Sequence, residues 1–432
     1  MNINVSNHPI NKSITVPTSK SHTNRLLILA SIYPETVIIK KFSHSTDVLI
    51  LIDCLKKIGL EIEIDNINET LTIKNSFPNS ENNLNNLNDL PIELNAGDGG
   101  TTNRFLLALL SRGSCRYKLH ANNLMLSRPI LELCNILRKF SVDISDTYPL
   151  ELKGPAIFEQ NKSGTEVKVE VEVDCSLSTQ FLSALMLAFA DKKINFVAKN
   201  ALSSVPYIDL TTNTVKNFYH NLKVKKNNVF EVPADFSSIA YPAALALICG
   251  DAVTIKNCHS IDFIQADAQL FNIISENFSK NINDLYKIDS SGLRINKCIQ
   301  KFSAIEVDCL PFPDLVPALA FICSYSIGES KLKNIKNLKF KESNRITEIC
   351  RVLTIFNIKH KYDDYKDELS ICGLEREGQD NKKKITPLDF HSPTDHRIAM
   401  MTYLFLRKNS GGNIYNWECV NKSFPNFFNE MF

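Results

Sequence analysis

A cluster of charged residues precedes a strongly periodic apolar segment between residues 346 and 356. Lys341 and Arg345 are four residues apart, so they share one face of a predicted helix, and Glu342 lies three residues before Arg345. A helix N-terminus carries a partial positive charge and disfavours cations, unless a bound anion faces it. The segment therefore predicts an anion site. A solvated turn with a Glu342–Arg345 ion pair is the alternative.

The same arrangement recurs along the chain. A polar or cationic segment followed by a run rich in Leu, Ala and Ile appears six times, starting near residues 19, 99, 176, 234, 311 and 393. Most of these runs are apolar nearly all round, which is typical of helices buried at the centre of a domain. Seven cations lie in or beside the first turns of these predicted helices or of the second helices that follow them: Lys20, Arg25, Arg104, Arg128, Lys341, Arg345 and Arg397. Arginine binds carboxylates and phosphates in a bidentate manner, so we expect a site for several anionic groups.

Two carboxylates at these starts, Asp314 and Glu342, could supply acid and base chemistry. Gly100 would let a ligand approach backbone N–H groups closely. The sequence contains no Walker or GxGxxG loop and no GxSxG motif. These features favour phosphorylated substrates without a nucleotide cofactor.

Composition restricts the class of protein further. The 432 residues suffice for two domains, and a formal net charge of +2 argues against a nucleic-acid partner. No apolar run reaches the roughly 18 residues that span a bilayer, and we expect no signal peptide. The 12 cysteines form no CxxC pair and the nine histidines no cluster. We therefore expect a cytoplasmic protein with buried thiols, without a metal or organic cofactor.

The pattern between the buried runs predicts an α/β fold. Amphipathic helices are expected at 47–58, 128–140, 208–222 and 345–356, and strands at 61–64, 92–94, 142–144, 166–171, 252–255, 304–307 and 358–362. Six units in two clusters predict two domains. We place the first at 1–18 plus 235–432 and the second at 19–234. Hinge segments are expected near 16–20 and 232–236, where an X-Pro step favours extended backbone. The Asn-rich stretch 75–88 and the charged stretch 376–384 are expected to be solvated loops.

Ordered motifs along nearly the whole chain resemble the 5-enolpyruvylshikimate-3-phosphate synthase family. They are Ser19-Lys20-Ser21-x-x-Asn24-Arg25, Gly100-Thr101-x-x-Arg104, Arg128-Pro129-Ile130, Ser178-Thr179-Gln180, Pro206-Tyr207, Pro313-Asp314, Asn337-x-x-x-Lys341-Glu342-x-x-Arg345, Asp395-His396-Arg397 and Lys422-Ser423-Phe424-Pro425. The resemblance implies a two-domain enolpyruvyl transferase fold with three βαβαββ units per domain, an inside-out α/β barrel. It also implies transfer of the enolpyruvyl group of phosphoenolpyruvate to the 5-hydroxyl of shikimate 3-phosphate with release of phosphate. We expect the protein to be a monomer.

The resemblance assigns roles to residues at the matching positions. Those expected to hold shikimate 3-phosphate are Ser21, Arg25, Ser178, Thr179, Ser204, Tyr207, Asn337 and Lys341. Those expected to hold phosphoenolpyruvate are Gly100, Arg128, Arg345, Arg397 and Lys422, while Lys20 and Gln180 would contact both substrates. For catalysis we expect Asp314 to act as base, Glu342 as acid at the methylene carbon, and Lys20 at the bridging oxygen.

Two other functions fit part of the pattern. UDP-N-acetylglucosamine enolpyruvyl transferase uses the same donor, but it carries a reactive Cys shortly before its Arg-Pro motif. Here residues 122–127 contain no Cys. A non-catalytic anion-binding protein would not need Asp314 and Glu342 beside the same cations.

Overall fold

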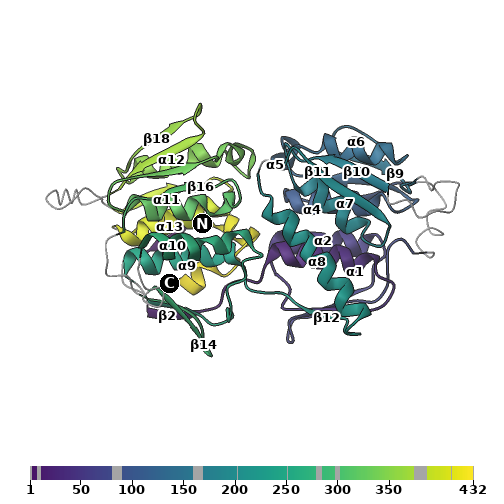
Figure 1. Ribbon diagram of the computed structural model, residues 1–432, viewed down its shortest axis with the longest axis horizontal. Coiled ribbons are helices and arrows are strands. Elements are labelled where there is room, and N and C mark those ends of the chain that lie inside the picture. Colours follow the sequence, from purple (N-terminus) through teal and green to yellow (C-terminus); the bar gives the residue numbers. More distant parts are fainter. Residues whose placement is uncertain are drawn as a thin grey trace. The chain divides into compact units, whose positions relative to one another are not determined.

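The computed structural model describes residues 2–6, 11–79, 90–158, 169–201, 203–250, 252–278, 285–296, 302–373, 387–409 and 411–431. These residues form two compact units (Figure 1). Unit 1 comprises Met1–Pro17 and Ala234–Phe432, and unit 2 comprises Thr18–Pro233.

The described strands form six sheets, three in each unit. The sheets of unit 2 have the orders β12-β3-β5-β4, β6-β7-β9-β8 and β10-β11. Their strands are β3 (Val37–Lys40), β4 (Ile62–Asp65), β5 (Thr70–Ile73), β6 (Ile92–Asn95), β7 (Arg116–His120), β8 (Asp143–Ile144), β9 (Leu150–Lys153), β10 (Val169–Asp174), β11 (Ile194–Lys199) and β12 (Val229–Glu231).

The sheets of unit 1 have the orders β14-β15-β13-β2, β16-β17-β19-β18 and β1-β21-β20. Their strands are β1 (Asn2–Val5), β2 (Asn11–Ile14), β13 (Ala252–Ile255), β14 (Tyr286–Asp289), β15 (Gly292–Ile295), β16 (Glu306–Asp308), β17 (Glu329–Lys333), β18 (Lys359–Asp363), β19 (Glu368–Cys372), β20 (Leu388–His391) and β21 (Gly412–Tyr415).

The four-stranded sheets share one topology, which explains the sequence repeat. Each combines one parallel pair, such as β6–β7 or β16–β17, with an antiparallel hairpin next to it. Parallel neighbours need a crossover connection, and the apolar runs supply it as helices. The predicted α/β fold built from βαβαββ units is confirmed. In the described residues the third unit of each half is shorter, because its sheet has two or three strands.

Three buried helices lie at the centre of each unit. They are α1 (Lys20–Ile32), α4 (Gly100–Leu110) and α7 (Gln180–Ala188) in unit 2, and α9 (Phe236–Cys249), α11 (Val316–Ser324) and α13 (His396–Lys408) in unit 1. Within each set the helices pack against one another. In Figure 1, α9, α10, α11 and α13 of unit 1 lie between β16 on one side and β2 and β14 on the other, whereas α12 lies between β16 and β18. Helices apolar on every face are stable only in such an interior position.

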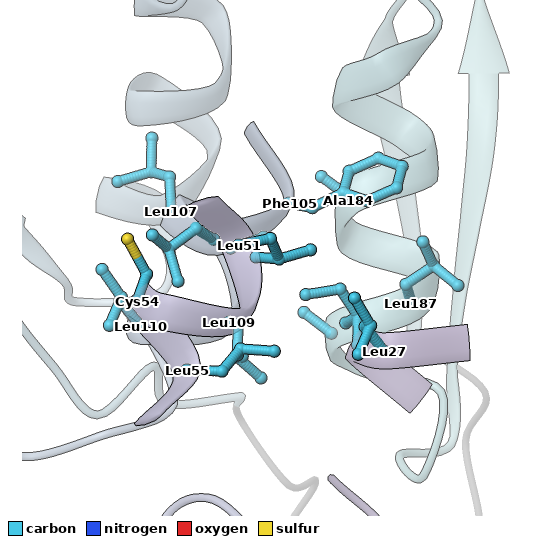
Figure 2. Packing of buried hydrophobic residues seen from close by; sticks show 14 of the residues in the cluster. Leu27, Leu51, Cys54, Leu55, Phe105, Leu107, Leu109, Leu110, Ala184 and Leu187 are labelled. Carbon is cyan, nitrogen blue, oxygen red and sulfur yellow. The ribbon is translucent and has the colours of Figure 1, made fainter. Parts of the chain in front are cut away.

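The structure describes seven further helices, several of which pack against the central ones. They are α2 (Thr46–Lys57), α5 (Asn123–Leu126), α6 (Leu131–Lys139), α8 (Pro206–Lys223), α10 (Gln269–Phe278), α12 (Arg345–Ile355) and α14 (Phe427–Met431), with the 3-10 turns η1 (Ala266–Ala268), η3 (Pro313–Leu315), η4 (Lys336–Phe340) and η5 (Trp417–Lys422). Figure 2 shows part of the core of unit 2, where Leu27 of α1, Leu51 and Leu55 of α2, and Leu107 of α4 lie fully buried. This packing fixes the first turns of the central helices, which carry the predicted site residues.

The chain passes between the units in two extended segments that are hydrogen bonded to each other. The Ser19 amide donates to the Pro233 carbonyl at 2.8 Å, and the Asp235 amide donates to the Pro17 carbonyl at 2.9 Å. Distant strands complete a sheet in each unit. β2 pairs with β13 in unit 1, and β12 pairs with β3 in unit 2.

Most predicted elements appear within two residues of their expected positions. The strand predicted at 166–171 is β10 (Val169–Asp174), which ends three residues later, and residues 166–168 lie outside the described residues. Helix α6 also differs from its prediction. It begins at Leu131 instead of at Arg128, which lies in the turn after α5. The charged stretch 376–384 lies outside the described residues, and the Asn-rich stretch 75–88 is described only to residue 79. In the described part of the chain, no helix has the length and apolarity needed to cross a membrane.

Candidate active site

In unit 1, Arg345 is the centre of a buried ionic cluster. Its side chain is 1% exposed and contacts three carboxylates. Nη1 donates to Asp314 at 2.7 Å, Nη2 to Glu342 at 2.7 Å, and Nε to Asp395 at 2.8 Å. Burial alone would lower the pKa of Arg345, but the carboxylates of Asp395, Glu342 and Asp314 outweigh it and raise the pKa above its usual value. The Glu342–Arg345 pair expected from the sequence is therefore one contact of a larger network.

Asp314 is the carboxylate on which most of these cations converge. It lies in η3, ahead of α11, and contacts Arg345 at 2.7 Å, Arg397 at 3.1 Å and Lys341 at 3.4 Å. Burial raises the pKa of Asp314, but Arg397, Lys341 and Arg345 outweigh burial and hold the pKa well below its usual value. Its side chain is still 21% exposed. Asp314 is thus an ionised carboxylate that a substrate can reach.

Cations surround Glu342 as well. Besides the Arg345 contact, the Lys422 ammonium lies 3.6 Å from Glu342 Oε1, and both side chains are about nine-tenths buried. Lys422 comes from η5, whereas Glu342 lies between η4 and α12. The structure thus brings together six sequence-predicted residues of unit 1, namely Asp314, Lys341, Glu342, Arg345, Arg397 and Lys422.

Local capping explains why these side chains are held in place. Asn344 caps α12 by accepting the Thr347 amide, so Arg345 is the first helical residue. Asp395 caps α13 by accepting the Arg397 amide, and it also accepts from Arg345 and Ser343. One aspartate thereby fixes two helix N-termini together.

Asn337, predicted to bind a substrate, lies in η4 apart from these ion pairs. Its side-chain oxygen is buried and has no hydrogen-bond partner among the described residues. A buried acceptor without a donor has an energetic cost, which a donor from a ligand would relieve.

In unit 2, Lys20 is the first residue of α1 and forms an ion pair with Asp47 of α2. Nζ lies 2.9 Å from Oδ2, and the two side chains are 23% and 5% exposed. The backbone carbonyl of Asp47 also accepts from Thr102 at 3.1 Å. A Cβ on Gly99 would lie 2.8 Å from the Asp47 carboxylate. Asp47 therefore holds Lys20 close to the glycine-rich start of α4.

Two arginines lie against Gly100. A Cβ built on Gly100 would come within 2.9 Å of both the Arg104 and the Arg128 guanidinium, so any side chain at this position would have to displace them. Arg104 donates to Gln180 Oε1 at 2.5 Å and to the Pro129 carbonyl at 2.6 Å. Burial and, second, the charge of Arg128 lower the pKa of Arg104 to about 9. Two adjacent arginines that disfavour each other's charge form a pre-built site for an anion.

Arg25 connects α1 to the first turn of α8. It is 2% exposed and donates to Thr211 Oγ1 at 2.8 Å, to the Ser21 carbonyl at 2.9 Å and to the Tyr207 carbonyl at 3.1 Å. Burial lowers the pKa of Arg25 to about 10. Three of the five guanidinium donors are engaged in these bonds to neutral acceptors. Arg25 therefore orders the polar residues around it.

The remaining predicted residues lie at the starts of α7 and α8. Ser178 Oγ accepts the Gln180 amide at 3.3 Å, and Thr179 donates to the Ser204 carbonyl at 3.4 Å. Gln180 also donates to Thr101 at 3.2 Å, which links α7 to α4. Ser204 adopts a left-handed backbone with φ of 60°, a strained conformation that often marks functional positions.

The charge balance differs between the two sets of residues. In unit 1, Lys341, Arg345, Arg397 and Lys422 face the carboxylates of Asp314, Glu342 and Asp395. In unit 2, the carboxylate of Asp47 is paired with Lys20, whereas the hydrogen-bond acceptors of Arg25 and Arg104 named above are neutral. Within the described residues, no group of three or more His, Cys, Asp and Glu side chains could hold a metal ion.

Comparison with known proteins identifies the family. The family model described as EPSP synthase (3-phosphoshikimate 1-carboxyvinyltransferase) matches residues 5–431. The chain belongs to the EPSP synthase family. Curated relatives named 3-phosphoshikimate 1-carboxyvinyltransferase include those of Buchnera aphidicola from Cinara cedri, with 28% identity over 98% of this chain and 94% of the relative, and of Methanosarcina acetivorans, with 26% identity over 100% and 97%.

Solved structures support the same fold. An EPSP synthase structure from Acinetobacter baumannii matches 99% of this chain and 96% of its own, with a TM-score of 0.69 and 21% identity. The enolpyruvyl transferase NikO from Streptomyces tendae matches with a TM-score of 0.69 and 12% identity. Membership of the EPSP synthase family makes this chain a carboxyvinyl transferase of the shikimate pathway that acts on small molecules. The alternative with UDP-N-acetylglucosamine as acceptor is not favoured.

Proposed function

We propose that the chain transfers the enolpyruvyl group of phosphoenolpyruvate to the 5-hydroxyl of shikimate 3-phosphate through the two sets of side chains described above. The observation that carries the proposal is the Asp314–Arg345–Glu342 arrangement. Two carboxylates are held by one buried arginine, with Asp314 Oδ1 and Glu342 Oε2 each 2.7 Å from it. The reaction needs a base and an acid near the same cations, and this arrangement supplies both.

The first step is addition of the hydroxyl across the vinyl bond. Asp314, ionised and accessible, takes the proton of the 5-hydroxyl as the oxygen attacks C2 of phosphoenolpyruvate. Glu342 delivers a proton to C3, which becomes a methyl group. The product is a tetrahedral ketal that still carries phosphate.

The second step eliminates phosphate and restores the double bond. Loss of a proton from the methyl group to Glu342 and departure of the phosphate give the enolpyruvyl ether. The departing phosphate takes up the proton that Asp314 received from the 5-hydroxyl, so both carboxyl groups return to their starting states. Lys20 stabilises the bridging oxygen, while Arg128, Arg345, Arg397 and Lys422 stabilise the carboxylate and phosphate of the donor. Lys341, Asn337, Ser21, Arg25, Ser178, Thr179, Ser204 and Tyr207 hold the acceptor, and Gln180 contacts both substrates.

The same proposal covers domain organisation and setting. Units 1 and 2 act as two domains that move about the segments near 16–20 and 232–236. The proposal also takes the protein to act as a monomer. Free thiols such as buried Cys54, Cys134 and Cys323 support a reducing compartment, the cytoplasm.

The test is phosphate release from phosphoenolpyruvate. We expect release with shikimate 3-phosphate and none with UDP-N-acetylglucosamine. Release with the nucleotide sugar alone would contradict the assigned acceptor, and inactivity with both would indicate a binding protein. The Asp314→Asn variant should lose at least about 100-fold in kcat, because a neutral amide cannot accept the proton.

A further inference from the structure

Asp267 is a buried carboxylate that the roles above do not include. It lies in the short turn η1 and is 3% exposed. Ser237, in the first turn of α9, donates a short hydrogen bond from Oγ to Asp267 Oδ2. The other oxygen, Oδ1, is buried without a hydrogen-bond partner among the described residues. A buried carboxylate with one unsatisfied oxygen destabilises a fold, so its presence calls for a functional reason.

The hydrogen bonds around Asp267 lead directly to the ionic cluster of unit 1. The backbone carbonyl of Ser237 accepts from Arg397 Nη1 at 3.4 Å, and Arg397 Nη2 donates to Asp314 at 3.1 Å. Asp267, Ser237, Arg397 and Asp314 thus form one chain of contacts across four elements. The adjacent Gln265 anchors the same helix start, because its side chain accepts the Phe236 amide at 3.1 Å.

The charged groups around Asp267 come from every element packed on η1. They are Asp235 before α9, Asp314 in η3 and Arg397 in α13, whereas Glu276, the acidic residue of α10, is exposed. Burial first, and then the charge of Asp314, raise the pKa of Asp267 to about 6, although Arg397 and the Ser237 hydroxyl oppose the shift. Asp267 therefore changes charge within a range of pH at which the protein can be assayed.

We propose that Asp267 is a positioning residue for the reaction: through Ser237 it holds Arg397, and its negative charge competes with the anionic donor for that arginine. When Asp267 is protonated, the chain of contacts remains but the competing charge is gone. The inference rests on the roles proposed for Arg397 and Asp314 in the transfer.

The experiment compares the full-length protein with its Asp267→Asn variant from pH 5 to pH 8, measuring kcat/KM for phosphoenolpyruvate with saturating shikimate 3-phosphate. Asparagine keeps an acceptor for Ser237 but cannot become charged. We expect the ratio of variant to wild type to be close to one at pH 5. It should rise by about three- to tenfold at pH 8, with a midpoint near pH 6. Ionisation of the substrate affects both proteins equally and cancels in the ratio.

Two further variants make the result specific. Ser237→Ala removes the donated hydrogen bond that favours the charged carboxylate, so the transition should move to higher pH. Asp289→Asn makes the same chemical change at an exposed turn of unit 1 and should give a flat ratio.

A measurement independent of activity is the ¹³C resonance of aspartate carboxyl carbons. One resonance should titrate near pH 6 in the wild type and be missing in Asp267→Asn. A ratio that stays flat across the pH range, or no such resonance, overturns the inference. If the wild type itself releases no phosphate, the proposed function fails instead, and the resonance still reports on Asp267.

Discussion

Arg345 and Asp314 are joined at 2.7 Å in a pair whose two side chains differ sharply in exposure, 1% for the arginine and 21% for the aspartate. Arg345 is held in the interior by two further carboxylates, those of Glu342 and Asp395, whereas the Asp314 side chain is partly exposed to solvent. This asymmetry places an ionised base at the surface of a rigid support, and substrate binding need not reorganise it.

Glu342→Gln tests the proposed acid. Glutamine keeps an oxygen for Arg345 but cannot carry the proton to C3, so kcat should fall about 100-fold or more while Kd for shikimate 3-phosphate changes little. Rapid-quench kinetics and calorimetry measure the two quantities. The matched control is Glu348→Gln on α12, where the glutamate pairs with Arg351, and this variant should keep its turnover. Unchanged turnover of Glu342→Gln would remove the residue from the mechanism.

Gly100→Ala tests the arginine pair of unit 2. The added Cβ would lie 2.9 Å from both guanidinium groups and must displace them. We expect KM for phosphoenolpyruvate to rise about tenfold or more, because Arg128 is assigned to the phosphoenolpyruvate site and Arg104 lies beside it. Affinity for shikimate 3-phosphate, measured in the same protein, should stay within about twofold. An equal loss for both substrates would indicate a general distortion of α4.

Thr211→Val tests whether Arg25 depends on its neutral partners. The change keeps the side-chain shape but leaves the buried Arg25 Nε without its acceptor at 2.8 Å. Unfolding free energy should fall by about 1–3 kcal/mol in urea titrations. Thr214→Val is the control on the same helix, because within the described residues the Thr214 hydroxyl donates to the Leu210 carbonyl of its own helix at 2.7 Å. Similar losses for both variants would contradict a special role for the Arg25 contact.

Stability should depend on pH through Asp267. Its pKa is raised in the folded protein to about 6, so the folded state binds this proton more tightly than the unfolded state. Proton binding by Asp267 stabilises the folded state fully below about pH 4, and this stabilisation is lost as the pH rises through about 6. Asp267→Asn should therefore be more stable than the wild type by about 1–3 kcal/mol at pH 7.5, with a smaller gain at pH 5. Thermal unfolding at both pH values measures this, and a gain independent of pH would refute it.

Much of the fold was predictable because its signals are local. The apolar periodicity of 345–356 is strong enough to define α12, which spans Arg345–Ile355. The pairing of β2 with β13 has no such signal, since strands so far apart in sequence meet only through tertiary structure. The start of α6 was misplaced because Pro129 resembles a normal helix start, whereas the turn at Arg128 is set by its neighbours.

The sequence signals for the site residues were partly local. Sequence reasoning named Lys341, Arg345, Arg397 and Lys422 and the carboxylates of Asp314 and Glu342, which lie together within unit 1. It assigned no role to Asp47 or Asp267. Asp47 lies in the first turn of α2, where an acidic residue is ordinary, so its pairing with Lys20 gave no signal. Asp267 follows no periodic pattern, and only its contact with Ser237 distinguishes it. Roles assigned from resemblance stay predictions.

The pairing of β2 with β13 also has a consequence for synthesis on the ribosome. Strand β2 emerges early, yet its partner at Ala252–Ile255 is translated only after all of Thr18–Pro233. Those intervening residues include β12 and so contain every strand of their own sheets. Unit 2 can therefore finish folding before the partner strands of β1 and β2 have been synthesised.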